Sequence, residues 1–436
     1  MIELLQIILS FFIFFLMITV PINIFNSELF IKKNFFSLDL ASFNLLLNCN
    51  ILLLLSFLPI SLSSYNLFFI FLYIFIFIYI YFIHNYKFNL YKNFIQFLSI
   101  LIVIFLIISI NVAGELNLGW DAKYFWYIKA LFFIENQNFY DLNKFIYIGN
   151  VEINAFHPHL GSYFWAFFWN LAPIKFEYFG RLFYVFLFCF SIFYVCHNNL
   201  RDKFLSNIIF ILIILIFYTY DKFSGLQEIL IFSILVLLSK YFFLLENSKK
   251  KYYVFFIILG CNLIIWFKSE GIAYSAILVL LLNFSRQVSN KTKVYANIFY
   301  LSIVVLKVII YKSSNIPLNA QPYYFEYISN LDFEFIIYKL KFIIPYFFYY
   351  ALTNVLFVSG IIILFMFNFQ KKNYSYIKLL NYYFILNLIF IFSAYLFRDM
   401  EIEHSVRVTL GRIIFTSSAF YVFLIVNFFK KLNRNF

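Results

Sequence analysis

The feature that most constrains this chain is a series of long apolar runs that recurs from the beginning of the sequence to its end. Most runs are about 16 to 24 residues long, and a helix of about 20 apolar residues can cross the hydrocarbon layer of a bilayer. The runs lie at 4–25, 41–60, 65–83, 94–112, 176–198, 205–219, 226–245, 252–267, 271–284, 294–311, 351–369, 377–397 and 408–428. We predict an all-α polytopic membrane protein with thirteen candidate spans, of which about 11 to 13 are transmembrane helices.

The composition excludes a soluble globular protein. Hydrophobic residues make up 64% of the chain and charged residues only 12%, against roughly 25% charged in a soluble domain. The 68 Phe and 36 Tyr accompany abundant Ile, Asn and Lys, residues that an AT-rich genome favours, so aromatic density alone does not indicate a sugar-stacking or base-stacking surface. The four cysteines fall inside apolar runs, which predicts packed thiols and no disulfide framework.

The net charge of +13 has a topological explanation. The basic residues concentrate in loops that all fall on one side of the thirteen-span alternation, and such loops are cytoplasmic in membrane proteins. These loops are 26–40, 84–93, 199–204, 246–252, 285–293, 370–378 and the tail. We therefore expect the N-terminus outside, the C-terminus in the cytoplasm, the lipid bilayer as a partner and no nucleic acid. The start of the chain has no basic segment before its apolar run, so we expect a retained span and not a signal peptide.

The opposite loops hold nearly all of the unusual polar residues, which places any chemistry outside. Loop 113–175 is the longest, and its stretches 122–134 and 160–172 are too short or too interrupted to span. They are typical of interfacial helices, with Trp120, Trp126, Trp165 and Trp169 suited to the headgroup zone. Segment 312–350 is expected to be a second external element whose helices are limited by Pro317, Pro322 and Pro345. No Gly-rich phosphate loop or internal repeat is present, so we expect no nucleotide partner.

Asp121 is the first candidate for chemistry. It follows the span 94–112 in the sequence Gly119-Trp120-Asp121-Ala122, so its carboxylate is predicted at the membrane boundary, where it can meet a lipid-linked substrate and act as a general base. The alternative is an N-cap for the helix expected at 122–134, because Asp is a preferred cap residue.

The second candidate is the sequence Phe156-His157-Pro158-His159. Two histidines around a proline can bind a metal, or can donate to a phosphate or hydroxyl. The alternative is a polar turn at the start of the following helix. No third metal ligand lies at local spacing, although Asp121 or Glu152 could supply one through the fold. We therefore assign no metal site and leave a divalent cation open as a cofactor.

Further ionisable residues lie inside or beside the apolar runs, where a charge costs about 2.5–3.5 kcal/mol at the helix centre and so indicates a function by default. They are Arg181, Lys268, Glu270, Arg398, His404, Arg407 and Arg412. Lys268 and Glu270 can simply pair with each other, and Arg398 with Asp399 or Glu401. Arg407 and Arg412 together with His404 suit an anionic lipid headgroup, since a guanidinium binds phosphate in a bidentate manner.

The order of these elements resembles the GT-C membrane glycosyltransferases, in particular the protein mannosyltransferase-like and aminoarabinose-transferase-like branch. The resemblance rests on the motifs GWDAKYFWYIKALFF, FHPHLGSYFWAF, YFGRLFYVFLF, WFKSEG and EHSVRVTLGRIIFTSS. It covers about 94–428, which we take as a GT-C-like transmembrane catalytic domain. Residues 1–93 then form an N-terminal three-helix extension, and 429–436 a cytoplasmic tail.

The resemblance implies a polyprenyl-phosphate-linked sugar donor, an acceptor glycan, lipid or protein on the outer face, and inversion at the anomeric carbon. Asp121 matches the family's catalytic aspartate in the first loop. The substrate or phosphate ligands that it implies, together with the charged residues above, are His157, His159, Arg181, Lys268, Glu270, His404, Arg407 and Arg412. His159 replaces the second proline of the family's HPP motif, and Ser162 stands where mannosyltransferases often carry Lys, which argues against protein O-mannosylation.

Two other functions remain open at this point. One is an O-antigen polymerase or ligase that uses polyprenyl-diphosphate donors, although its usual long external loop lies late in the chain. The other is a flippase or transporter of lipid-linked sugars, which should show inverted repeats or charges in mid-membrane helices. In each case we expect a multi-pass protein of a bacterial inner membrane that takes part in building the cell envelope.

Overall fold

The computed structural model describes the chain apart from residues 21–37, 84–87, 116, 144–146, 149–150, 153, 201, 218–219, 249, 251, 318–332, 370–374, 398–400 and 433–436. The chain divides into two compact units, Met1–Ser233 and Ile234–Phe436, which we describe one at a time. Many basic loop residues of the sequence analysis, such as Lys32 and Lys371, lie outside the described residues, as does Arg398.

The fold is helical, as predicted for a polytopic membrane protein. Among the described residues, eight helices are long and apolar enough to cross a membrane, and six shorter apolar helices accompany them. Each of the thirteen apolar runs overlaps a helix. The number of helices that cross the bilayer therefore stays a prediction, while the helical membrane character is confirmed.

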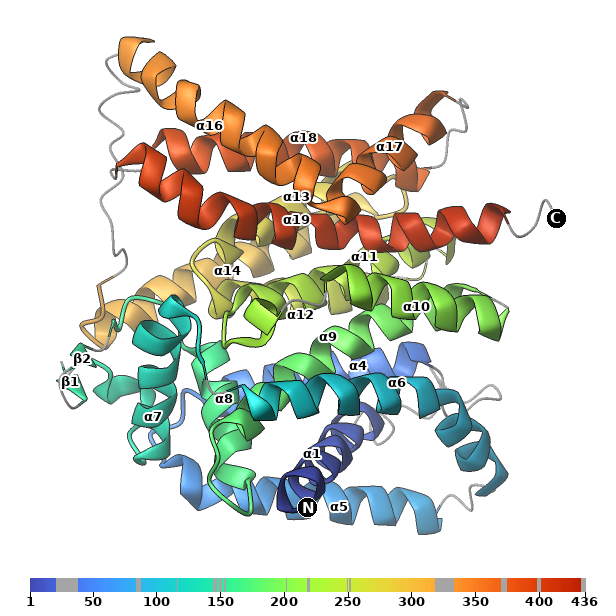
Figure 1. Ribbon diagram of the computed structural model, residues 1–436, viewed down its shortest axis with the longest axis vertical. Helices are drawn as coiled ribbons and strands as arrows, with labels where there is room; N and C mark the ends of the chain where they lie inside the picture. Colours follow the sequence, from blue (N-terminus) through green and yellow to red (C-terminus); the bar gives the residue numbers. More distant parts are fainter. Residues whose placement is uncertain are drawn as a thin grey trace. The chain divides into compact units, whose positions relative to one another are not determined.

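Among its described residues, the first unit contains seven long apolar helices and a set of short elements between them. Figure 1 shows their arrangement. The helices are α1 (Ile2–Thr19), α4 (Leu38–Leu55), α5 (Leu62–Ile83), α6 (Phe88–Gly114), α8 (Leu160–Leu171), α9 (Tyr178–Asn199) and α10 (Lys203–Phe217). The short elements are the π-helix η1 (Ala122–Tyr127), α7 (Ile128–Ile134), the 3-10 turns η2 (Phe139–Asp141) and η3 (Tyr220–Phe223), and the antiparallel pair β1 (Tyr147–Ile148) and β2 (Val151–Glu152).

Helix α9 is the centre of the first unit, because its 20-residue apolar window is buried along its whole length. It packs against α8, α6, α10 and α1. Phe183 of α9 stacks on Phe168 of α8 with 4.5 Å between ring centroids. Gln6 of α1 donates from Nε2 to the Tyr178 hydroxyl at 2.9 Å. The helices of 1–93, expected as a separate extension, thus pack in the same unit as the His-Pro segment.

The sequence analysis was wrong about how α8 is placed. The helix itself is confirmed at Leu160–Leu171, but all ten residues from Leu160 to Trp169 are buried. An interfacial helix needs one face in contact with the membrane surface, whereas α8 is an internal packing element. Trp126 is buried as well, and of the four tryptophans of this loop only Trp120 is exposed.

The part of the second unit that the structure describes has seven helices and the end of α11 (Glu228–Ser248), which begins in the first unit. They are α12 (Tyr252–Phe267), α13 (Gly271–Phe284), α14 (Asn290–Ser313), α16 (Phe333–Thr353), α17 (Val355–Phe369), α18 (Ser375–Leu396) and α19 (Ile402–Leu432). Helices α12 and α13 form a tight hairpin, in which Ser275 donates to the carbonyl of Cys261 at 2.9 Å.

Helix α16 corrects a second expectation. The prolines of 312–350 suggested a broken external element, yet 333–353 is a 21-residue helix, long and apolar enough to span, with Pro345 inside it. A proline lacks the N–H of the helical ladder, but transmembrane helices tolerate it because neighbouring groups satisfy the freed carbonyl.

Helices α16 and α17 make one continuous course along α19 (Figure 1). The ring of Tyr350 lies against Gly411, and that of Tyr421 against Gly360. Further on, Phe367 contacts Phe428. These contacts advance together along both segments, so α16 and α17 run parallel to α19 with only a break at Asn354. The number and alternation of the spans stay a prediction, because the sequence analysis did not count Phe333–Thr353 as a span.

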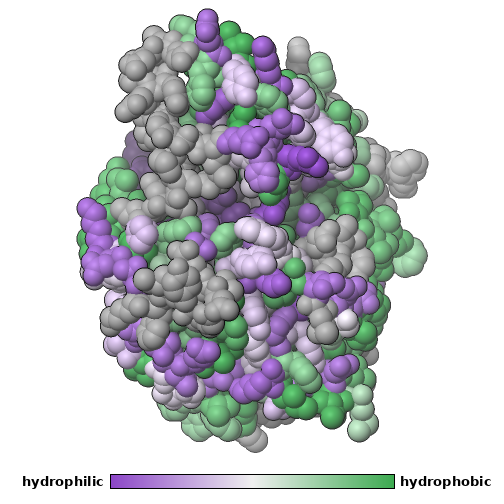
Figure 2. All heavy atoms as spheres, turned by 60° about the vertical axis from the view of Figure 1, so that its left-hand side comes forward, coloured by the Kyte–Doolittle hydropathy of each residue, from purple (hydrophilic) through white to green (hydrophobic). Residues whose placement is uncertain are grey.

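The surfaces of the helices fit a lipid environment. The apolar windows of α14 and α16 are only 22% buried within the protein, which leaves large hydrophobic side chains outward. In the view that brings the left-hand helix ends of Figure 1 forward, hydrophilic residues gather over those ends and hydrophobic residues lie along the flanks (Figure 2). This division is what a bilayer requires of a spanning protein.

The orientation predicted from the basic loops can be tested with single cysteines, because all four native cysteines are buried. Tyr140 of the long loop and Asn247 near the end of α11 are both exposed. We expect an impermeant thiol reagent to label Tyr140→Cys in intact cells and to label Asn247→Cys only after the cells are opened. The reverse pattern would overturn the orientation and the outer location of loop 113–175.

Candidate functional site

Asp121 lies seven residues after the end of the apolar helix α6, in the long loop 113–175. Residues 120 and 121 are helical, and from Ala122 the helix widens into the π-helix η1, a form that often marks functional positions. Asp121 has right-handed helical backbone angles, and its side chain makes no capping hydrogen bond. The Asp121 side chain therefore does not act as the N-cap that the sequence analysis gave as the alternative to a general base. The side chain is half-buried, beside the 66% exposed Trp120.

The segment that carries Asp121 rests on the loop after η3. The backbone N–H of Gly119 donates to the carbonyl of Ser224 at 3.0 Å. Gly225 has a φ of +93°, and a Cβ there would lie 2.6 Å from the Trp165 ring and 2.9 Å from the Ala122 Cβ. Glycine is thus required at 225 both by its backbone angle and by the close approach of η1 and α8.

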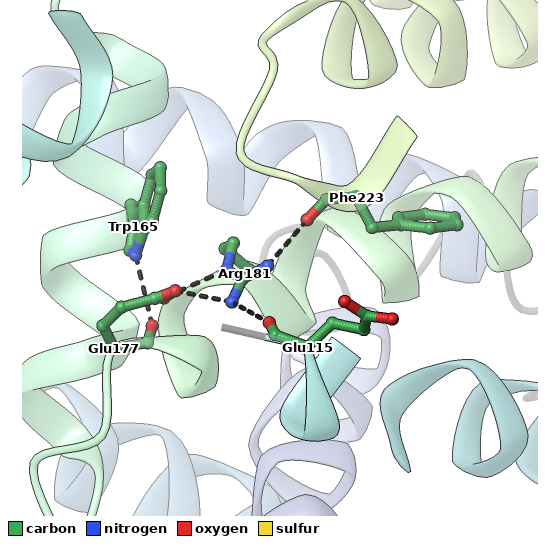
Figure 3. Close-up of polar contacts among 5 residues, drawn as sticks. All are labelled: Glu115, Trp165, Glu177, Arg181 and Phe223. Atoms are coloured by element: carbon green, nitrogen blue, oxygen red, sulfur yellow. Dashed lines mark hydrogen bonds and ion pairs between the residues drawn. The ribbon is translucent and has the colours of Figure 1, made fainter. Parts of the chain in front are cut away.

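Arg181 joins three segments: the start of α9, the last residue of η3 and the residue after α6 (Figure 3). Its side chain is fully buried near the start of α9. The guanidinium donates from Nε to the Glu177 carboxylate at 3.0 Å, from Nη1 to the Phe223 carbonyl at 3.1 Å and from Nη2 to the Glu115 carbonyl at 3.4 Å. Nη2 also forms an ion pair of 2.5 Å with Glu177.

This arrangement gives Arg181 an organising role. One guanidinium joins the end of α6, six residues before Asp121, to the last residue of η3 and to the start of α9. Every nitrogen of the guanidinium has a partner within the protein. The contact of Arg181 with a phosphate stays a prediction. Burial raises the pKa of Glu177, while the charge and the hydrogen bonds of Arg181 oppose that shift. The indole of Trp165 donates to the Glu177 carbonyl at 3.2 Å.

His157 lies against the helix that begins at Asp121. Its ring contacts those of Phe125 and Trp126, with centroids 5.0 and 5.3 Å away. Its backbone carbonyl accepts a 2.5 Å hydrogen bond from the ammonium of Lys129 in α7. Lys129 is fully buried, and burial lowers its pKa to about 7. The sequence analysis missed Lys129, although a lysine between apolar residues of a predicted helix was a signal that could have found it.

His159 has a different environment from His157. Its Nε2 lies 2.7 Å from the hydroxyl of Ser56, at the end of α4. Its ring packs between those of Phe57 and Phe139, with centroids 5.0 and 4.5 Å away. The side chain is fully buried, so in this structure His159 joins α4 to the start of α8. Its proposed contact with substrate stays a prediction.

The turn after the histidines depends on Gly161. The hydroxyl of Tyr184 donates to the Gly161 carbonyl at 2.9 Å and accepts from Gln227 at 2.9 Å. A Cβ at position 161 would lie 1.4 Å from the Gln227 Oε1. The start of α8 therefore packs directly against Tyr184 of α9 and against Gln227, the residue before α11. This packing leaves no room for a side chain at position 161.

In the second unit, Lys268 and Glu270 pair with each other, with 3.3 Å between Nζ and Oε1. Sequence analysis named this pairing as the alternative to a binding role. A third charged residue that it did not name lies beside them. Lys307 of α14 is buried and donates to the carbonyl of Ile265 at 2.8 Å, at the end of α12.

The residues at the start of α19 are more open. The helix begins at Ile402, six residues before the apolar run 408–428, with His404 and Arg407 exposed and Arg412 half-buried. Arg407 and Glu403, both described, form no ion pair within 4.0 Å. The Tyr350 hydroxyl donates to the Arg407 carbonyl at 2.6 Å.

Tyr350 also fills the space beside the glycine of this helix. A Cβ at Gly411 would lie 3.0 Å from the ring of Tyr350. An aromatic ring of α16 therefore covers this face of α19 at Gly411.

Within the described residues, no group of three or more His, Cys, Asp and Glu side chains is arranged to hold a metal ion. The structure brings the His157 backbone onto the helix that begins at Asp121, and it brings Lys268 and Glu270 together. Asp121 belongs to the first unit, and Lys268, Glu270 and the α19 residues belong to the second. Comparisons of the chain with protein-family models, with curated proteins and with solved structures find no match.

The closure at Gly161 predicts a specific loss of stability. Gly161→Ala forces its Cβ into Gln227, and overpacking of this kind costs typically about 1–3 kcal/mol. We expect a lower thermal midpoint for the purified protein in detergent. Gly114→Ala, at the end of α6, is the matched control, because no atom lies within 4 Å of a Cβ placed there. Equal midpoints for the two variants would show that α8 does not depend on this contact.

Proposed function

We propose that the chain is a membrane glycosyltransferase. It transfers a sugar from a polyprenyl-phosphate donor to an acceptor hydroxyl of a cell-envelope glycan, lipid or protein on the outer face of the membrane. The observation that carries the proposal is the position of Asp121, a half-buried carboxylate at the first turn outside an apolar helix, with a side chain that is not used as a helix cap. The ordered motifs that resemble the GT-C glycosyltransferases support it.

The chemistry needs one base. Asp121 accepts the proton of the acceptor hydroxyl while the hydroxyl oxygen forms a bond to the anomeric carbon of the sugar. The bond between that carbon and the phosphate oxygen breaks, and the polyprenyl phosphate leaves with the electron pair. Attack from the side opposite the leaving group inverts the anomeric configuration. A phosphate needs little proton donation to leave, so the reaction requires no nucleotide and no second acid.

The surroundings of Asp121 suit this task. The exposed Trp120 lies next to it, and tryptophan favours the boundary between lipid and water. The network of Arg181 holds the backbone on both sides of the loop, which supports a fixed position for a base. Lys129 and the rings of Phe125 and Trp126 hold His157 against the same helix, where its imidazole can donate to a substrate hydroxyl.

We expect Asp121→Asn to leave the protein folded and inserted, because the amide has almost the same shape as the carboxylate. Sugar transfer from a polyprenyl-phosphate sugar should fall by about 10²–10⁴-fold, the usual contribution of a general base. The measurement is initial-rate transfer by purified protein in liposomes.

The matched control is Asp141→Asn, which changes a second carboxylate of the same loop. Asp141 accepts a hydrogen bond from Asn138 in η2 and has no role in the proposed chemistry. Near-normal turnover by Asp121→Asn, or equal losses in both variants, would remove Asp121 from the mechanism.

A further inference from the structure

A hollow in the first unit lies between the turn from α4 to α5 and the end of α7. It is lined by Leu55, Ser56, Leu58, Ile60, Leu62, Tyr65, Phe133, Gln137, Asn138 and Tyr163. Its volume is about 190 Å³ when the open space at its mouth is included. The enclosed part has room for about one water-sized group. A bound molecule would therefore place one small group in the hollow and lie across the mouth with the rest.

The lining of the hollow is uncharged and mixes polar with apolar side chains. Its polar members are three hydroxyl residues and two carboxamides, and the other five are apolar. Leu58 and Ile60 are large hydrophobic residues that are 40% and 48% exposed. An ion placed here would lose water without gaining an opposite charge from the lining, which is costly. The lining instead suits an uncharged molecule that has hydroxyl groups and an apolar face.

Two of the polar lining residues are already used within the protein. The Ser56 hydroxyl donates to a carbonyl of α4 at 2.6 Å, and its oxygen lies 2.7 Å from the His159 Nε2. The Asn138 amide donates to the Asp141 carboxylate. These contacts fix the wall of the hollow.

The groups left for a ligand belong to Gln137 and to a pair of tyrosines. The half-buried carboxamide of Gln137 makes no hydrogen bond with the described residues, so its two N–H donors and its carbonyl oxygen remain. The hydroxyls of Tyr65 and Tyr163 bond to each other, which uses one of their two O–H donors. A hydroxyl group of a ligand both donates and accepts, and these side chains offer both kinds of partner.

The hollow lies at a fixed distance from Asp121. The helical segment from residue 120 to residue 134 is continuous, and Phe133 of the lining lies twelve residues after Asp121. This separation is about 15 to 18 Å along the helix axis, because the rise is 1.5 Å per residue and somewhat less in the π-helical part. A single sugar ring is too short to reach from the hollow to Asp121, so a ligand that occupies both positions has several rings.

We propose that the hollow binds one sugar ring of an uncharged glycan, and that this glycan is the acceptor of the proposed transfer. Gln137 binds a ring hydroxyl, and the apolar residues of the lining contact the face of the ring. The role as acceptor rests on the proposed glycosyltransferase function, whereas glycan binding does not. The segment 1–93 then has a role at the site, because six of the ten lining residues belong to it.

The structural explanation to be separated from this one is a packing gap between the α4–α5 turn and α7. Gln137→Leu distinguishes the two, because leucine has a similar size but cannot bind a hydroxyl. The matched control is Gln287→Leu. Gln287 is a half-buried glutamine of the second unit, and its carboxamide also makes no hydrogen bond with the described residues.

The test uses the purified full-length protein in detergent on an array of immobilised uncharged oligosaccharides. The array carries oligomers of glucose, mannose, galactose and N-acetylglucosamine from one to six rings long, and the strongest binder is then titrated in solution. We expect affinity to rise with the number of rings and to fall about three- to tenfold in Gln137→Leu, which loses a hydrogen bond to the ligand. Gln287→Leu and Asp121→Asn should bind like the wild type.

Several results would overturn the glycan site. They are a lack of binding to every oligosaccharide, equal affinities for Gln137→Leu and Gln287→Leu, and affinity that does not depend on the number of rings. Displacement of the bound glycan by solubilised diacylglycerol would assign the hollow to a lipid headgroup and would also overturn it. If Gln137→Leu fails to fold, Tyr65→Phe is the deciding variant and should weaken binding in the same way.

The same protein separates this site from the proposed function. Length-dependent binding without transfer of sugar from a polyprenyl-phosphate donor onto the bound glycan would contradict the proposed function and leave the glycan site in place. Transfer by a protein whose activity and glycan affinity are unchanged in Gln137→Leu would support the function and remove the hollow from it.

Discussion

The buried guanidinium of Arg181 is the interaction on which the first unit depends. A charge removed from water is tolerated only when its donors are satisfied and an opposite charge is close. Glu177 supplies the charge, and the carbonyls of Glu115 and Phe223 take the remaining donors. Because these carbonyls belong to the end of α6 and to η3, one side chain determines how three segments meet. The position of Asp121 follows from that arrangement.

The same physical requirement recurs wherever an apolar helix ends inside the protein. Carbonyls at a helix end have no partner in the next turn, and no water reaches them in an apolar environment. Buried side chains supply the donors. Asn48 of α4 binds the carbonyls of Met17 and Val20 at the end of α1, at 2.7 and 2.5 Å. Three buried lysines also donate to carbonyls near helix ends or turns: Lys129 to His157, Lys307 to Ile265 and Lys339 to Leu396.

The sequence predicted the helices well because apolar length is a local property. The bounds of α8 lie within one residue of the predicted stretch 160–172, and α12 and α13 coincide with the runs 252–267 and 271–284. Burial was less predictable. The polar and aromatic residues of α8 suggested a membrane surface, but residues of α5, α7 and α9 cover it, and only the fold brings α5 and α7 against it. The prolines of 312–350 suggested broken helices, yet Pro345 lies inside α16.

The candidate site was predictable to the extent that its residues are conspicuous. An aspartate after an apolar run identified Asp121, and the spacing of Lys268 and Glu270 anticipated their pair. Apart from the Glu177 carboxylate, the partners of Arg181 and Lys307 are main-chain carbonyls. Every residue has such a carbonyl, so no sequence pattern could identify them. Ser56 and His159 are 103 residues apart, and only the fold brings them together. Glu177 was within reach, because it lies four residues before Arg181 on the same helical face.

The measurement that tests this account most directly is amide hydrogen exchange of the wild type and of Arg181→Lys. Lysine keeps the positive charge but lacks the planar fork that reaches three acceptors. We predict faster exchange in peptides that cover Glu115–Trp126 and Phe223–Gln227, with exchange in α19 unchanged. Unaltered exchange in both segments, or an equal rise along the whole chain, would contradict the claim that Arg181 holds the loop that carries Asp121.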